Sequence, residues 1–190
     1  MQKAANVTAA KPKKTGPIYR APLGTKLPTD AISDLDAAFK CLGYIAEDGM
    51  KNENSPESES VKAWGGDIVL NSLTEKPDNF RFKLIEALNP ETLKTVYGSD
   101  NVTGDLETGI SVSVNSSETE EASYVFDMIL KNGVLKRIVI PCASITEMEE
   151  IVYKDDEEVG YDITLGATPD ENGNTHYEYI IAKQTTAAEG

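Results

Sequence analysis

Much of the chain alternates apolar and polar side chains with the two-residue period of half-buried β-strands. The run FRFKL (80–84), for example, places its three apolar residues on one face of a predicted strand. The strongest hairpin signal is SYVFDMILKNGVLKRIVIP (123–141), in which two β-rich runs flank Asn132 and Gly133, a pair that favours a type I′ turn. We therefore expect antiparallel strand pairs to dominate the fold.

Shorter stretches predict the other strands and one loop. Single strands are expected at 16–22 (GPIYRAP), 67–75 (DIVLNSLTE), 108–117 (TGISVSVNSS) and 143–153 (ASITEMEEIVY). In the last of these the alternation slips between Ile145 and Met148. Residues 159–182 are expected to form a last hairpin that turns through DENGN at 170–174. The polar, acidic stretch KNENSPESES (51–60) predicts an exposed, mobile loop.

Two segments carry helical signals. In NPETLKTVYG (89–98) the asparagine is a good N-cap, the proline suits the first helical position and the glycine ends the helix. At 33–41, apolar residues recur at helical spacing after Asp30 or Ser33 as N-cap candidates. With about nine or ten strands, no repeats and no βαβ alternation, the sequence predicts a mostly β protein, a β-sandwich or barrel with one or two short flanking helices.

Charge divides the chain into unequal parts. Residues 1–28 contain six of the 18 bases and none of the 32 acids, and the whole chain has a net charge of −14. The prolines of this segment disfavour helix. We therefore expect an extended basic N-terminal arm (1–28), a β-sandwich domain (29–182) and a flexible C-terminal tail (183–190). The arm is either a solvated tail or a segment that docks on the acidic body of a neighbouring copy.

The second alternative gives a specific hypothesis about assembly. Lys11, Lys13, Lys14 and Arg20 are expected to reach an acidic surface on another copy of the chain. Deletion of residues 1–28 would then leave a folded protein that cannot self-assemble. The acidic body itself is a poor binder of DNA, because affinity for DNA comes from basic contacts to phosphates.

Residue types that carry chemistry are few. Cys41 and Cys142 are the only cysteines and His176 is the only histidine, too few for a disulfide framework, a zinc site or a multi-histidine centre. DENGN (170–174) superficially resembles the start of a calcium loop, but it lacks the glycine at the sixth position, where Thr175 stands, and the glutamate at the twelfth, where Ile181 stands. No nucleotide-binding motif and no motif of a catalytic nucleophile occurs in the sequence. We expect a protein that is not an enzyme and needs no cofactor or metal. With no secretory signal and no run of about 18 apolar residues, no membrane association is expected.

The stretch KAWGGDIVL (62–70) contains the only tryptophan of the chain. Our interpretation is that Trp64 anchors the end of a strand in the core, while Gly65 and Gly66 allow a sharp bend or bulge before the next strand begins. The alternative is an exposed tryptophan that binds a sugar or a protein partner.

Four stretches occur together in an informative order. GPIYRAPLGTKLPTDA, LDAAFKCLGYIAEDGM, VKAWGGDIVL and FRFKLIEALNPETLKTVYGSDNVTG lie within residues 5–105. This part of the chain resembles the major tail tube proteins of long, flexible-tailed phages of the siphovirus type, and a looser resemblance continues to about residue 182. The resemblance implies a β-sandwich with a flanking helix, and no catalytic residues.

The resemblance also implies a function. Members of that family form six-fold rings that stack around a tape-measure protein, and tail terminator and baseplate or initiator proteins complete the tail. Double-stranded DNA passes through the lumen without specific binding. The expected location is the virion tail, assembled in the host cytoplasm, with the serine-bearing strand near 108–116 as the candidate for the lumen wall. The alternatives are the tube of a tailocin or a secretion-type injection machine, and a carbohydrate-binding or adhesin β-sandwich.

Overall fold

The computed structural model describes residues 2–182, including the side chains of these residues except 5 and 73–75. Within that range the chain forms the helix α1 (Pro90–Tyr97), the 3₁₀ turns η1 (Ala4–Asn6), η2 (Ser99–Asn101) and η3 (Lys131–Gly133), and the strands β1 (Ala10–Pro12), β2 (Ile18–Pro22), β3 (Lys40–Cys41), β4 (Lys51–Glu53), β5 (Glu57–Lys62), β6 (Ile68–Glu75), β7 (Asn79–Leu84), β8 (Val102–Thr103), β9 (Ser111–Val112), β10 (Ala122–Leu130), β11 (Leu135–Met148), β12 (Tyr161–Ala167) and β13 (Tyr177–Ile181).

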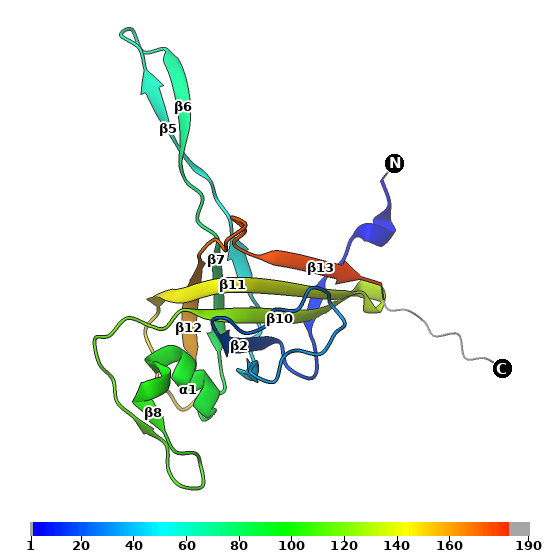
Figure 1. The fold of residues 1–190 in the computed structure, drawn as a ribbon, viewed down its shortest axis with the longest axis vertical. Helices are drawn as coiled ribbons and strands as arrows, with labels where there is room; N and C mark the ends of the chain where they lie inside the picture. Colours follow the sequence, from blue (N-terminus) through cyan, green and yellow to red (C-terminus); the bar gives the residue numbers. More distant parts are fainter. Residues whose placement is uncertain (1, 183–190) are drawn as a thin grey trace, which may run out of the picture.

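One antiparallel sheet contains nine of the described strands, in the order β3-β2-β10-β11-β12-β7-β4, with β1 and β13 as branches. The long strands β10 and β11 form its centre (Figure 1). β1 and β2 follow one another along the outer edge of β10, and β13 and β12 do the same along the outer edge of β11. The pairs β5–β6 and β8–β9 are separate two-stranded ladders.

The large sheet curls around its core. Two strands separate β7 from β10 in the sheet, so in a flat sheet they would lie about 14 Å apart. Phe82 of β7 nevertheless packs edge-on against Phe126 of β10, with ring centroids 5.3 Å apart. Leu84, Ile140 and Leu165 are fully buried in the same core. A curled antiparallel sheet with one helix confirms the predicted mostly β, sandwich-like class.

The helix α1 forms where the sequence predicts it. The side chain of Asn89 accepts a hydrogen bond from the backbone N–H of Glu91 at 3.0 Å, and Gly98 ends the helix with a φ of 94°. Leu93 and Val96 are buried against the core. The helix therefore covers part of the core that the curled sheet leaves open.

The predicted hairpin of residues 123–141 is also confirmed as β10–β11. Asn132 and Gly133 both take the positive φ values that the turn requires, 61° and 74°. β11 then continues to Met148 with a bulge between Ile145 and Glu147, where the alternation of the sequence slips.

The other face of β10 and β11 is covered by the segment 23–39. Val125 and Val139 are fully buried on this face and form a second cluster with Phe39. Because both faces of β10 are buried, its residues are apolar at almost every position instead of alternating with polar ones.

The predicted helix at 33–41 is wrong, because these residues form turns and the short strand β3. Asp30 accepts hydrogen bonds from the N–H groups of Ile32 and Ser33 at 2.7 and 2.6 Å. It therefore acts as the cap of a single turn that does not propagate. The backbone carbonyl groups of Asp30 and Ser33 are instead bound by Arg137, at 3.1 and 2.9 Å.

Arg137 connects this turn to the centre of the sheet. Its side chain lies directly opposite Asp127 in the β10–β11 register and is 1% exposed. Nε and Nη2 donate to the two carboxylate oxygens of Asp127 at 2.6 and 2.9 Å. All polar contacts of the guanidinium are thus made inside the protein, as a buried charge requires.

Three other local predictions are wrong. Residues 51–60 contain β4 and the first four residues of β5 in place of a loop. The strand expected at 108–117 is reduced to β9, which pairs only with the two-residue strand β8. The last hairpin, 159–182, does not form, because β12 and β13 are collinear partners of β11 instead of partners of each other. The partner of β4 is β7, and the partner of both β12 and β13 is β11, so these pairings lie outside the segments themselves and alternation within one segment does not reveal them. β5 and β9 pair with their neighbours in sequence, β6 and β8.

Part of the expected N-terminal arm, 1–28, contributes to the sheet. Residues 10–12 and 18–22 pair with β10, and residues 2–9 precede the first of these strands (Figure 1). The expected C-terminal tail, 183–190, lies outside the described residues.

Candidate assembly site

The hairpin β5–β6 extends away from the sheet and is the most prominent projection of the molecule (Figure 1). Within residues 2–182 its strands pair only with each other. Among the described side chains of its two strands, Val61, Ile68, Val69 and Leu70 are apolar and more than half exposed. Neighbouring residues of a strand face opposite sides, so apolar groups are uncovered on both faces. Paired strands with free edges and uncovered apolar faces are features that proteins use to associate.

Trp64 lies at the tip of this hairpin and is completely exposed, with a relative exposure of 106%. The prediction that it anchors the core is therefore wrong for the single chain. Gly65 and Gly66 are in the turn that follows, with φ values of 118° and 99°, and the N–H of Ala63 donates to the carbonyl oxygen of Asp67 at 2.8 Å across it. The glycines thus permit a hairpin turn that presents the indole to the surroundings.

The sequence did not indicate that residues 61 and 68–70 would be uncovered. DIVL has the composition of a buried strand. The only local clue was its partner: β5 has the sequence ESESVK, too polar to form one wall of a core. Pairing an apolar strand with such a partner leaves the apolar side chains without cover.

The four bases predicted to reach another copy divide into two pairs. Lys13 binds Asp127 at 3.2 Å and Arg20 binds Glu120 at 2.9 Å, both within the same chain. Lys11 and Lys14 are exposed, and within residues 2–182 they make no contact of this kind. The contact with a second copy stays a prediction for all four bases, and Lys11 and Lys14 are the two that are fully available for it.

The Arg20 contact closes a polar cluster at the end of β2. Glu120 also accepts hydrogen bonds from the backbone N–H and the hydroxyl of Ser99, at 3.0 and 2.9 Å. Partial burial raises the pKa of Glu120, but the hydrogen bonds and the charge of Arg20 outweigh it, so its pKa lies below the ordinary value. Deleting residues 1–28 would remove this contact and two strands, so such a truncation is no longer expected to fold.

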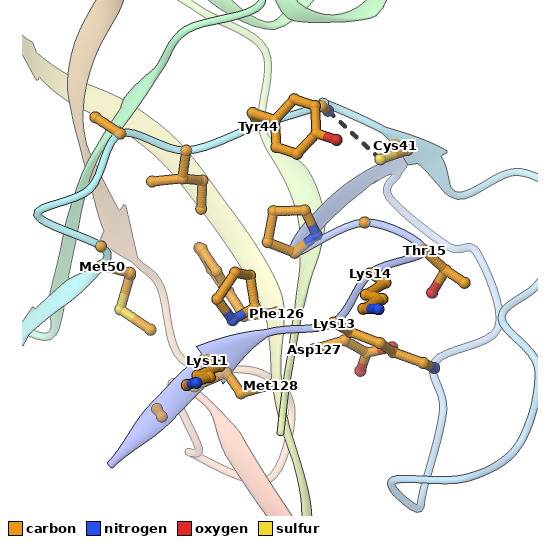
Figure 2. A pocket seen from close by; sticks show the side chains of 18 of the residues that line it. Lys11, Lys13, Lys14, Thr15, Cys41, Tyr44, Met50, Phe126, Asp127 and Met128 are labelled. Carbon is orange, nitrogen blue, oxygen red and sulfur yellow. Dashed lines mark hydrogen bonds and ion pairs between the residues drawn. The ribbon is translucent and has the colours of Figure 1, made fainter. Parts of the chain in front are cut away.

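A cavity of about 930 Å³ lies between the segments 10–17 and 43–50. Phe126, Met128 and Met50 contribute apolar side chains to it, and Lys11 and Lys14 lie on the wall formed by the N-terminal segment (Figure 2). The opposite segment contributes Glu47, Asp48 and the exposed ring of Tyr44. The cavity therefore has an apolar interior, one basic wall and one acidic wall.

The remaining candidates for chemistry have structural environments. Cys41 and Cys142 are free thiols, and partial burial raises the pKa of Cys142. His176 contacts the buried carboxylate of Asp78 through Nδ1 at 2.5 Å, and Thr175 donates to the same oxygen atom. Among the described residues no group of histidine, cysteine and acidic side chains is arranged to hold a metal ion. Residues 170–174 form a turn in which Asp170 accepts backbone hydrogen bonds.

Comparison with known proteins agrees with this structural picture. The family model described as phage tail tube protein matches residues 3–189, nearly the whole chain. The chain belongs to the phage tail tube protein family. No curated protein matches it.

Membership of this family has direct consequences for the predictions. The tail tube protein is a structural component of the virion tail, and because the family is non-enzymatic, the prediction that the chain is not an enzyme is confirmed. In the described part of the tail tube protein, no helix has the length and apolar character needed to cross a membrane.

Proposed function

We propose that this protein assembles with copies of itself into six-fold rings, and that stacked rings form the tail tube through which DNA leaves the virion. Family membership supports the tube, and the resemblance noted from the sequence supports the ring symmetry. The observation that carries self-assembly is the hairpin β5–β6, whose apolar residues Val61, Ile68, Val69 and Leu70 are more than half exposed in the described chain.

The size of this exposed surface indicates how strongly association would be favoured. Burying a valine or leucine side chain contributes about 1.5–3 kcal/mol. The four exposed aliphatic residues of the hairpin and Trp64 together offer several such contributions. These contributions offset part of the cost of association, which is about 4–15 kcal/mol.

Charge supports the role of a DNA conduit. The chain has a net charge of −14, and a tube built from acidic subunits repels DNA phosphates, which prevents the passing duplex from adhering to the wall. By the same reasoning the partners of the tube are proteins: a tape-measure protein inside it, and terminator and baseplate or initiator proteins at its ends. Assembly takes place in the host cytoplasm.

Microscopy of the purified protein tests the proposal. Negative-stain images at increasing protein concentration are expected to contain rings or hollow tubes, and analytical ultracentrifugation is expected to give a concentration-dependent change from monomer to large particles. Strict monomers at high concentration, including after addition of preformed tube ends, would contradict the proposal.

A matched pair of variants tests whether the hairpin is responsible. Val69→Ser removes an exposed apolar side chain from the hairpin, 62% exposed, and Val114→Ser removes a valine that is 75% exposed from the loop 113–117. We expect Val69→Ser to raise the concentration required for assembly about 10-fold, the equivalent of one buried valine. Val114→Ser is expected to assemble like the parent, and circular dichroism should show both variants folded.

A further inference from the structure

The tip of the β5–β6 hairpin combines an aromatic group with two opposite charges. Trp64 is fully exposed at the turn, with exposed Lys62 before it and exposed Asp67 after it. Within residues 2–182 neither of these two charges has an ion-pair partner. An exposed tryptophan between unpaired charges has the composition of an interface hot spot, which binds best in an apolar pocket with a charged rim.

The cavity between segments 10–17 and 43–50 has the complementary composition. Its interior offers Phe126, Met50 and Met128, and sulfur atoms and ring edges make favourable contacts with an indole (Figure 2). At about 930 Å³ the cavity is larger than one indole requires and suits the end of a two-stranded ribbon.

The charges of the two surfaces are complementary in sign. The basic wall presents Lys11 and Lys14 to an acidic group such as Asp67, and the acidic wall presents Glu47 and Asp48 to a basic group such as Lys62. This match favours a hairpin tip over an anionic ligand such as a phosphate, which would be repelled by the acidic wall.

The hairpin cannot fill the cavity of its own chain. β6 has eight residues, which span about 26 Å, and the hairpin extends outward from the sheet (Figure 1). Its tip is therefore presented to another molecule. We propose that the cavity between segments 10–17 and 43–50 of one copy receives the β5–β6 tip of a second copy, with Trp64 on the apolar interior. This inference rests on the proposed self-assembly and identifies the two surfaces that meet.

Crosslinking between two variants tests the contact directly. Both carry Cys41→Ser and Cys142→Ser. One also carries Ala63→Cys at the hairpin tip, and the other carries Thr15→Cys, an exposed residue of the cavity rim. After co-assembly, a short bismaleimide reagent is expected to give a crosslinked dimer. The control replaces Thr15→Cys with Val114→Cys, which is equally accessible but lies outside the cavity.

The outcomes separate the two proposals. If tubes form and Ala63→Cys crosslinks to position 15 but not to position 114, the inference is supported. If tubes form without that crosslink, or with equal crosslinking to both positions, the hairpin tip docks elsewhere and the inference is overturned. If the parent protein forms no assembly under any condition, the proposed function fails, and the inference fails with it.

Substitutions at both surfaces provide a second, functional readout. Trp64→Ala is expected to raise the concentration for assembly about 100-fold, as for an interface hot spot, and Trp64→Phe to recover part of the loss. Reversing the charge of the basic wall with Lys11→Glu and Lys14→Glu should also weaken assembly. Adding Asp67→Lys to that variant should restore part of the lost assembly. Tryptophan emission in the parent should shift to shorter wavelength on assembly. An unchanged emission maximum, or a Trp64→Ala protein that assembles normally, would contradict the inference.

Discussion

The buried ion pair between Arg137 and Asp127 allows a quantitative test of the fold. Replacing Arg137 with methionine keeps most of the side-chain volume but removes two hydrogen bonds to Asp127 and two to backbone carbonyl groups of the 30–33 turn. The carboxylate of Asp127, 3% exposed, would retain only Lys13 as a charged partner. Breaking a buried pair by removing one member costs about 3–5 kcal/mol.

That loss is a large part of the stability expected for one domain, about 5–15 kcal/mol. For a chain of this size it corresponds to a decrease in Tm of roughly 6–20 °C. Urea denaturation followed by far-ultraviolet circular dichroism is the appropriate assay, since the tryptophan lies on the exposed hairpin and reports poorly on the core.

Arg81 provides the matched control. It also donates through Nε and Nη2 to both carboxylate oxygens of an aspartate, Asp162, at 3.0 and 2.8 Å, but its side chain is 45% exposed compared with 1% for Arg137. Water screens the exposed pair, so Arg81→Met should change the free energy of unfolding far less. If Arg137→Met costs no more than Arg81→Met, burial does not decide the strength of this contact and our reasoning is refuted. The double variant Asp127→Leu with Arg137→Met should recover part of the loss, because no unpaired charge remains buried and the partly exposed Lys13 can be solvated.

Three further predictions follow from local features. Burial raises the pKa of Asp78, but hydrogen bonds from Thr175, Asn52 and His176 outweigh burial and lower that pKa. The ionised Asp78 therefore contributes its full stabilisation above about pH 4, and this stabilisation is lost as the pH falls through the folded-state pKa. Asp78→Asn should flatten the acid side of a plot of Tm against pH. Gly104 has a φ of 82°, and Gly104→Ala places a Cβ against the carbonyl of Gly109, so it should lower the free energy of unfolding by about 2 kcal/mol or more in chemical denaturation. Gly24 has the same φ but open space around it, so Gly24→Ala should lower that free energy by about 1 kcal/mol. Equal losses of stability would show that the contact with Gly109 is relieved. In the dilute monomer, Trp64 should emit at long wavelength and be readily quenched by acrylamide, and a shielded, blue-shifted emission there would contradict its exposed position.

The sequence determined the elements whose causes are local. The helix at 90–97 follows from its asparagine cap, proline and terminal glycine, and the β10–β11 hairpin follows from the turn preferences of Asn132 and Gly133. The alternation in 80–84 likewise gave a strand with one buried face. These signals act between residues a few positions apart, so they are complete in the sequence.

Only the tertiary structure decided what each element packs against. The segment 33–41 has the apolar spacing of a helix, but the outer face of the sheet and the hydrogen bonds from Arg137 hold it as turns. β12 and β13 share the edge of β11 instead of pairing with each other. Trp64 was expected to be buried because hydrophobicity indicates a preference for burial but not the partner that provides it, and the structure leaves Trp64 and the apolar run at 68–70 exposed. In this tail tube protein we propose that the partner is another copy of the same chain.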